Sequence, residues 1–218
     1  MKLAGTDRPS PAKTSDYVAE LEAKLDHLQH DLDMLREAHD CRQYHVERVE
    51  EELKLAARLQ RDFLPKSLPN HGNVQFNRLY RPAGHVSGDL YDVRRLDEEW
   101  CGVYLADAIG HGMPAALLAM FMHNALSTKK IDAAAGPSGY ELLDSAEAMR
   151  RLNETLCGQG LTHATFATAL YARVHVKSGL VDLARGGHPY PLLIRDGGDV
   201  EEVGDDGALL GIMPREQF

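Results

Sequence analysis

The chain has 218 residues, of which 44% are apolar, so it is long enough for one globular domain of ordinary size and an appendage. Its net charge of −9 has no basic tract behind it, which argues against a nucleic-acid backbone or an anionic membrane surface as a partner. The three cysteines are far apart, so their spacing excludes a zinc motif and fits reduced thiols in a cytoplasmic protein.

The first residues show neither a targeting segment nor a pattern of secondary structure. Residues 1–14 are rich in small residues, proline and lysine and have no hydrophobic periodicity, so we expect them to be disordered. Farther along, the longest apolar run, Met113–Met122, is shorter than the ~20 residues that a membrane helix needs. The sequence therefore predicts a protein with no membrane partner.

Residues 15–64 are predicted to form a coiled coil followed by a linker helix. Apolar side chains recur at alternating steps of three and four residues, with mostly charged residues between them. A helix of this length spans roughly 70 Å at 1.5 Å per residue, which is more than one small domain can cover. We therefore expect a parallel homodimer through the coiled coil. The repeat consists of Val18, Leu21, Leu25, Leu28, Leu32, Leu35, His39, Arg42, Val46, Val49, Leu53 and Ala56.

Two features of this helix bear on its use. His39 and Arg42 place polar side chains in the apolar seam, which is consistent either with a dimer that tolerates two polar layers or with a joint that transmits a signal. Near the end, the helix carries more apolar surface than the seam requires, so we expect that extra face to dock on the globular domain and Phe63 to matter more for activity than for dimerisation. The face consists of Leu55, Ala56, Leu59, Phe63 and Leu64. Pro65 then ends the helix.

Residues 65–218 are predicted to form one domain of the α+β class, in which two helices interrupt a series of strands. The strands are expected at Val74–Tyr80, Leu90–Leu96, Trp100–Ala106, Thr165–Val176, Leu180–Ala184, Pro191–Arg195 and Val200–Val203, and the helices at Met113–Thr128 and Gly139–Cys157.

The strands before and after the turn at residues 97–99 form a hairpin with one aspartate at each open end. If Leu96 pairs near Trp100, Asp89 and Asp107 return to the same edge of the sheet. Two carboxylates held close repel one another unless a cation lies between them, and hard oxygen ligands suit Mg²⁺ or Mn²⁺. Aspartate beside glycine is also ordinary turn chemistry. The spacing alone therefore leaves a metal site and a plain turn both open.

Four segments carry a resemblance to a known family: SGDLYDV at 87–93, DAIGHGMPAALL at 107–118, ARGGHPYPLLI at 184–194 and LLGIMP at 209–214. Their order and spacing resemble the bacterial sporulation stage II protein E type of serine phosphatase, within the protein phosphatase 2C (PPM) superfamily. The resemblance covers about residues 56–218. It implies an antiparallel β-sandwich flanked by helices, with a pair of Mn²⁺ or Mg²⁺ ions at one end.

The resemblance also implies an activity, a metal-dependent protein serine/threonine phosphatase, and the residues that serve it. Asp107 would bridge or ligate the metals, the Ala108 backbone carbonyl would complete the coordination of one metal, and Asp89 would hold metal-bound water. The substrate implied by the family is a phosphorylated anti-sigma-factor antagonist. Residues 56–65 correspond to the helix that links regulatory and phosphatase domains in the family, which predicts control through the coiled coil.

Other polar residues near the motifs are expected to have supporting roles. His111 is expected to order the turn after Asp107 without ligating a metal, and His188 is expected to shape a loop. Ser87 precedes a strand and lacks the Gly-x-Ser-x-Gly pattern of a nucleophile elbow. The proposed chemistry therefore needs no covalent nucleophile.

The sequence departs from the resembled family at its end. Two further metal-site aspartates of the family follow the Leu-Gly-Ile block, and none stands between that block and Phe218. We therefore expect a phosphatase domain that lacks its last strands, either because the chain is truncated or because part of the site is missing. A catalytically incomplete dimeric scaffold, which binds a regulatory partner through the same face, is the alternative function.

Overall fold

The structure is a computed structural model that describes residues 11–71, 73–132, 139–160 and 165–218. The chain divides into two compact units, with the boundary between Glu52 and Leu53. The predicted disorder of residues 1–10 lies outside the described residues. Residues 11–14, which were also expected to be disordered, already have helical backbone.

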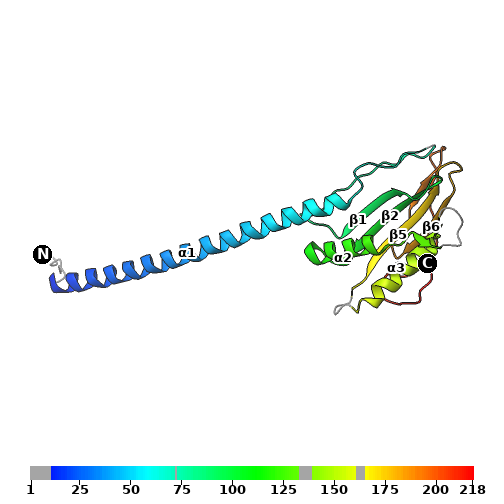
Figure 1. Ribbon diagram of the computed structural model, residues 1–218. Coiled ribbons are helices and arrows are strands. Elements are labelled where there is room, and N and C mark those ends of the chain that lie inside the picture. The colour runs from blue at the N-terminus through cyan, green and yellow to red at the C-terminus, as the bar shows by residue number, and fades with distance from the viewer. Residues whose placement is uncertain (1–10, 72, 133–138, 161–164) are drawn as a thin grey trace, which may run out of the picture. The chain divides into compact units, whose positions relative to one another are not determined.

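Helix α1 (Pro11–Phe63) is one continuous helix of 53 residues, drawn in blue to cyan in Figure 1. The helix predicted over residues 15–64 is thereby confirmed, whereas its pairing as a coiled coil stays a prediction. All residues from 15 to 52 are exposed, and the seam residues Leu28 and Leu35 are exposed by 66% and 68%. No helix in the described part of the chain is both long enough and apolar enough to cross a membrane.

The last turns of α1 belong to the second unit and pack within it. Ala57 and Leu64 are buried, and Ala57 clusters with Val86 and Ala116. Docking of this end of the helix through Leu64 is as predicted, whereas Phe63, which was expected on the same face, remains 49% exposed. The heptad periodicity does not show which side of the helix meets the domain.

The second unit is built around a four-stranded antiparallel sheet with the strand order β1-β2-β5-β6. Short antiparallel pairs are formed by β3 with β4 and by β7 with β8. The α+β class and six of the seven expected strands are confirmed, with boundaries shifted by a few residues. The strands are β1 (Asp89–Arg95), β2 (Trp100–Ala108), β3 (Lys129–Ile131), β4 (Tyr140–Leu142), β5 (Ala167–His175), β6 (Val181–Gly186), β7 (Leu192–Ile194) and β8 (Val200–Glu202).

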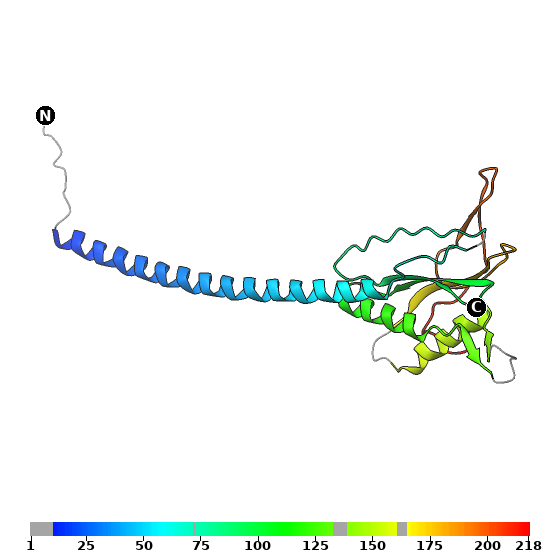
Figure 2. The same ribbon diagram turned by 45° about the horizontal axis from the view of Figure 1, so that its top comes forward.

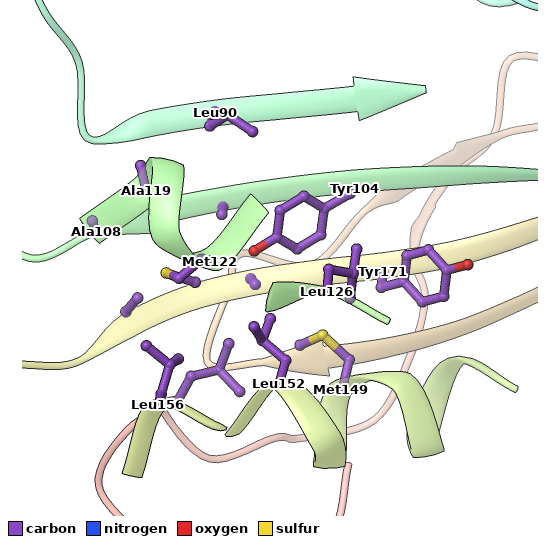
Figure 3. Packing of buried hydrophobic residues seen from close by; sticks show 14 of the residues in the cluster. Leu90, Tyr104, Ala108, Ala119, Met122, Leu126, Met149, Leu152, Leu156 and Tyr171 are labelled. Carbon is purple, nitrogen blue, oxygen red and sulfur yellow. The ribbon is translucent and has the colours of Figure 1, made fainter. Parts of the chain in front are cut away.

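Two helices cover one face of this sheet, as Figures 1 and 2 show from two directions. Helix α2 (Gly112–Ala125) contacts β1 and β2, and α3 (Ser145–Gly158) contacts β5 and β6. The core fills the space between the helices and the sheet (Figure 3). Tyr104 and Tyr171 from neighbouring strands, Met122 from α2 and Leu152 from α3 are almost completely buried there. Alternation along β2 turns Tyr104 inward because successive strand residues point to opposite faces.

The strand predicted at Val74–Tyr80 is wrong. This segment is extended chain, and within the described residues its bridging is limited to a single contact between His71 and Val74. The backbone N–H of Phe76 instead donates to Asn70 Oδ1 at 2.7 Å. An apolar alternation becomes a strand only where another strand supplies hydrogen-bond partners, and the sequence of one segment cannot provide that.

The helix predicted at Gly139–Cys157 begins only at Ser145. Asp144 caps it, since the Asp144 carboxylate accepts a hydrogen bond from the Glu147 N–H at 2.7 Å. Residues 140–142 form β4 against residues 129–131, and the helix expected to reach Thr128 ends at Ala125. The cap and the strand pairing outweigh the helical periodicity because they satisfy backbone groups that a longer helix would leave at its end.

The face of the sheet opposite the helices is covered by extended chain (Figure 2). Residues 76–81 line a groove of about 580 Å³ over β1 and β2, together with Tyr91, Val103 and Leu105. An antiparallel β-sandwich was expected from the resemblance. Among the described residues, the sheets other than the four-stranded one are the two-stranded pairs β3–β4 and β7–β8.

Leu152→Ala is expected to destabilise the second unit by about 2–5 kcal/mol, because it opens a cavity between α3 and the sheet. Leu180, which is 60% exposed, offers the same substitution on the surface, where the expected change is within about 0.5 kcal/mol. Urea unfolding followed by tryptophan fluorescence measures both. Similar losses for the two variants would contradict the core described here.

Candidate metal centre

The β1–β2 hairpin brings the two predicted aspartates together. Asp89 and Asp107 are directly opposite in the strand register. A compact turn sets this register, because the Asp97 carboxylate accepts hydrogen bonds from the N–H groups of Glu99 and Trp100, both at 2.8 Å. Each strand then runs from this turn to an aspartate, so the carboxylates meet at one edge of the sheet.

The proximity of the Asp89 and Asp107 carboxylates is electrostatically unfavourable when no cation is bound. Burial raises the pKa of Asp89 above its usual range, the negative charge of Asp107 raises it further, and His188 offsets part of the effect. A raised carboxyl pKa means that the ionised form is disfavoured in the folded protein. Two ionised carboxylates at this edge therefore attract a counter-ion.

The carboxylates open into a cavity of about 420 Å³. Residues 83–89 line one side of the cavity, and Gly110, His111 and Gly112 line another. Gly110 and Gly112 have φ angles of 88° and 72°, a left-handed conformation that side chains other than glycine rarely adopt. The chain can therefore turn sharply between Asp107 and α2, and His111 becomes the residue before that helix.

Ala108 lies at the same edge as the aspartates. Its N–H donates to the Gly88 carbonyl at 3.2 Å, and a Cβ at Gly88 would lie only 2.9 Å from the Ala108 carbonyl oxygen. The absence of a side chain at Gly88 thus lets the two backbones approach. The β1–β2 pairing and the contact between Gly88 and Ala108 therefore place all three predicted site residues, Asp89, Asp107 and Ala108, close together.

His188 is nearer to the centre than its predicted role as a loop-shaping residue implies. Its Nδ1 lies 2.9 Å from Thr168 Oγ1, and Thr168 is opposite Asp107 in the β2–β5 register. Burial lowers the pKa of His188, while Asp107 and Asp89 raise it. The Gly-His-Pro motif was the available signal, but a loop residue cannot be placed beside a distant hairpin from sequence spacing.

Two further residues near the centre carry no catalytic signature in the sequence. Gln60 in α1 is buried, and its side chain is hydrogen-bonded to the backbone of Ser87. The Ser87 hydroxyl accepts a hydrogen bond from the Asp89 N–H at 3.1 Å. Ser87 therefore shapes the turn before Asp89, in line with its rejection as a nucleophile. A glutamine on the apolar face of a helix was the one signal that could have drawn attention to this contact.

The donor groups are of the chemical type that a hard divalent cation prefers, but they are fewer than a complete coordination shell needs. Two carboxylates and a backbone carbonyl are oxygen donors of the kind that Mg²⁺ and Mn²⁺ prefer, and both ions commonly retain water at their other positions. Within the described residues, however, no cluster of three or more histidine, cysteine, aspartate or glutamate side chains is placed to hold a metal. The residues present therefore suit one cation better than the pair expected from the resemblance.

Comparison with known proteins shows the family to which the chain belongs. Residues 97–218, more than half of the chain, match the family described as stage II sporulation protein E (SpoIIE). The chain belongs to the SpoIIE family. It is thereby grouped with protein phosphatase 2C (PP2C)-type protein serine/threonine phosphatases, as the four sequence motifs indicated.

Relatives of this SpoIIE family member are considerably longer. Protein IcfG from Synechocystis sp. is 24% identical over 184 residues, which are 77% of this chain and 29% of the relative. Phosphoserine phosphatase RsbP from Bacillus subtilis is 29% identical over 147 residues, 67% of this chain and 35% of the relative. The chain thus spans about a third of their length.

The fold is shared with a solved structure, the SiaA-PP2C domain of Pseudomonas aeruginosa. The two superimpose with a TM-score of 0.60 at 23% identity, over 79% of this chain and 66% of that domain. The likeness confirms the PP2C-like fold predicted from the motifs.

Asp107→Asn is expected to stabilise the metal-free protein at pH 7, because it removes the charge facing Asp89. Two unit charges about 4 Å apart in a water-like medium repel by about 1 kcal/mol, which corresponds to a rise of ~2–4 °C in the unfolding midpoint of a domain of this size. Thermal unfolding in a chelator measures this change.

Asp196→Asn, in the exposed β7–β8 turn, is the matched control and should leave the midpoint unchanged. Added Mn²⁺ should raise the midpoint of the wild type and the control but not that of Asp107→Asn. Destabilisation of the metal-free protein by Asp107→Asn would show that the aspartates do not repel one another.

Proposed function

We propose that this chain is a metal-dependent protein serine/threonine phosphatase that removes phosphate from a phosphoserine regulatory protein. The observation that carries the proposal is the register pairing of Asp89 with Asp107 beside the cavity at the end of the sheet. Membership of the SpoIIE family and the similarity to phosphoserine phosphatases RsbP and RsbU support the reaction type. By the same family resemblance, the proposed substrate is a phosphorylated anti-sigma-factor antagonist.

The residues at the site would have different roles around a Mn²⁺ or Mg²⁺ ion. Asp89 and Asp107 would hold the cation, with the Ala108 carbonyl as a further oxygen donor. Such a cation neutralises phosphoryl oxygens and lowers the pKa of water near it. His111 and His188 border the same carboxylates and would bind or orient the phosphoryl group. Gly110 and Gly112 add no side chains to the cavity wall that they share with His111, which leaves room for a protein substrate.

Mn²⁺-dependent hydrolysis of a phosphoserine protein tests the proposal. Asp107→Asn should reduce kcat/KM at least about 100-fold, because the interactions of a catalytic cation are worth several kcal/mol and each 1.36 kcal/mol is a factor of ten. Asp196→Asn should retain wild-type turnover. Activity that survives in Asp107→Asn, or that does not depend on a divalent cation, would refute the mechanism.

The absence of a third acidic ligand from the described residues favours one alternative, a partner-binding module without catalysis. Such a module would bind the phosphoprotein but would not turn it over with Mn²⁺ or Mg²⁺ present. The same assay with a binding readout, such as fluorescence anisotropy of the labelled phosphoprotein, separates the two functions.

The proposal includes a cytoplasmic homodimer controlled through α1. Its three cysteines are free, in keeping with a reducing compartment. The exposed seam over residues 15–52 would pair with a second copy. In a parallel pair, Asp31 of one helix would face Arg36 of the other, and His45 would face Glu50, which favours the parallel arrangement.

Leu28→Asp is expected to weaken the homodimer at least about 100-fold. The change removes an apolar side chain from both helices, worth about 3–6 kcal/mol for the layer, and each 1.4 kcal/mol is tenfold in affinity. Met34→Asp, on an exposed helix position outside the seam, is the matched control. Sedimentation equilibrium measures both, and a monomeric wild type would contradict the coiled coil.

A further inference from the structure

The imidazole ring of His188 is held by a threonine of the sheet. His188 Nδ1 lies 2.9 Å from Thr168 Oγ1. Thr168 in β5 is directly opposite Asp107 in β2. Residues that are directly opposite in an antiparallel pair have their side chains on the same face of the sheet, with Cβ atoms about 4.5–5.5 Å apart. The ring is therefore anchored next to one of the two carboxylates, although His188 itself belongs to neither strand.

The backbone around His188 is fixed independently of Thr168. Arg185, which is 8% exposed, donates from Nη1 to the His188 carbonyl at 2.5 Å. The Gly187 N–H donates to the Gly207 carbonyl at 3.0 Å. These two bonds set the course of the loop, so the bond to Thr168 mainly decides how the ring is oriented. Removal of the Thr168 hydroxyl should therefore free the ring and leave the loop in place.

The bond to Thr168 also decides which ring nitrogen is available to a ligand. Within the described residues, the hydrogen bonding of the His188 ring is limited to this contact through Nδ1. Nε2 carries a proton in the cationic ring, and also in the neutral ring whose Nδ1 accepts from the threonine hydroxyl. His188 and Asp89 line the same groove. An N–H donor is thus held close to the candidate cation ligands.

We propose that Thr168 is a positioning residue, which orients the ring of His188 so that Nε2–H donates a hydrogen bond to a phosphoryl oxygen of the substrate. The inference rests on the proposed function, since the phosphoryl group is the ligand which that function brings to the site. Phosphoryl oxygens carry negative charge, and a hydrogen bond to an ionised acceptor is roughly twice as strong as a neutral one. Thr168 touches neither the substrate nor the cation, so its contribution passes through His188.

The test measures the affinity for inorganic phosphate by isothermal titration calorimetry in the presence of Mg²⁺. Thr168→Val keeps the shape of the side chain and removes the hydroxyl. We expect its dissociation constant for phosphate to rise about 3- to 10-fold, the effect of one hydrogen bond. Thr168→Ser keeps the hydroxyl and should bind phosphate as the wild type does. Thr155→Val is the matched control, because it removes a threonine hydroxyl that donates to the Arg151 carbonyl on the exposed side of α3.

Two further readouts separate positioning from a merely structural role. In nitrogen NMR spectra of the wild type, added phosphate should shift the resonance of His188 Nε2 more than that of Nδ1. Both resonances are identified by their loss in His188→Phe. The affinity for Mn²⁺ should be equal in the wild type and Thr168→Val, because the substitution leaves Asp89 and Asp107 in place.

His188→Phe also supplies the test if Thr168→Val does not fold by circular dichroism. It keeps an aromatic ring and removes both nitrogens, so it should weaken phosphate binding at least as much as Thr168→Val. Equal phosphate affinity of the wild type and the folded variants would overturn the inference, even for a wild type that hydrolyses phosphoserine. A phosphate-induced shift confined to Nδ1, a Thr168→Ser variant as weak as Thr168→Val, or a loss of Mn²⁺ affinity in Thr168→Val would overturn it as well.

The remaining outcomes distinguish this inference from the proposed function. Weaker phosphate binding by the variants of a wild type that does not hydrolyse phosphoserine would support the role of Thr168 and refute the phosphatase. A wild type that does not bind phosphate would overturn the role of Thr168, and the Mn²⁺-dependent hydrolysis assay then decides the proposed function by itself.

Discussion

The close approach of Asp89 and Asp107 is the constraint on which the rest of the second unit depends. Two carboxylates opposite one another in a strand register repel, and burial together with the negative charge of Asp107 raises the pKa of Asp89. A fold tolerates such a pair only if other interactions hold the strands in place. The hairpin turn, the sheet beside it and the buried core under α2 and α3 supply them.

Each neighbour of the pair limits its movement in a different direction. The turn at Asp97 sets the register, and β5 fixes the far side of β2. Gly88 allows the loop before Asp89 to lie against Ala108, and Gln60 holds the same loop from α1. The two carboxylates are therefore preorganised. Preorganisation favours cation binding because little free energy is lost in ordering the ligands.

The comparisons and the geometry contribute different parts of the functional assignment. Family membership rests on residues 97–218 and supports the proposed reaction type. It does not cover Asp89, Ser87 or Gln60, which lie before the matched range, and the relation of these residues to Asp107 comes from the structure. The phosphatase proposal therefore depends on both sources.

The sequence by itself determined the long helix, the α+β class, the β1–β2 hairpin and the pairing of Asp89 with Asp107, because these follow from local periodicity and turn chemistry. It failed at Val74–Tyr80, where a strand pattern has no partner strand, and at residues 140–144, where pairing and a cap replaced helix. Only the tertiary structure decided that Phe63 stays exposed, that His188 lies near the carboxylates and that Gln60 binds Ser87. The surroundings of these three residues depend on segments that lie far from them in the chain, and no local sequence pattern encodes such long-range contacts.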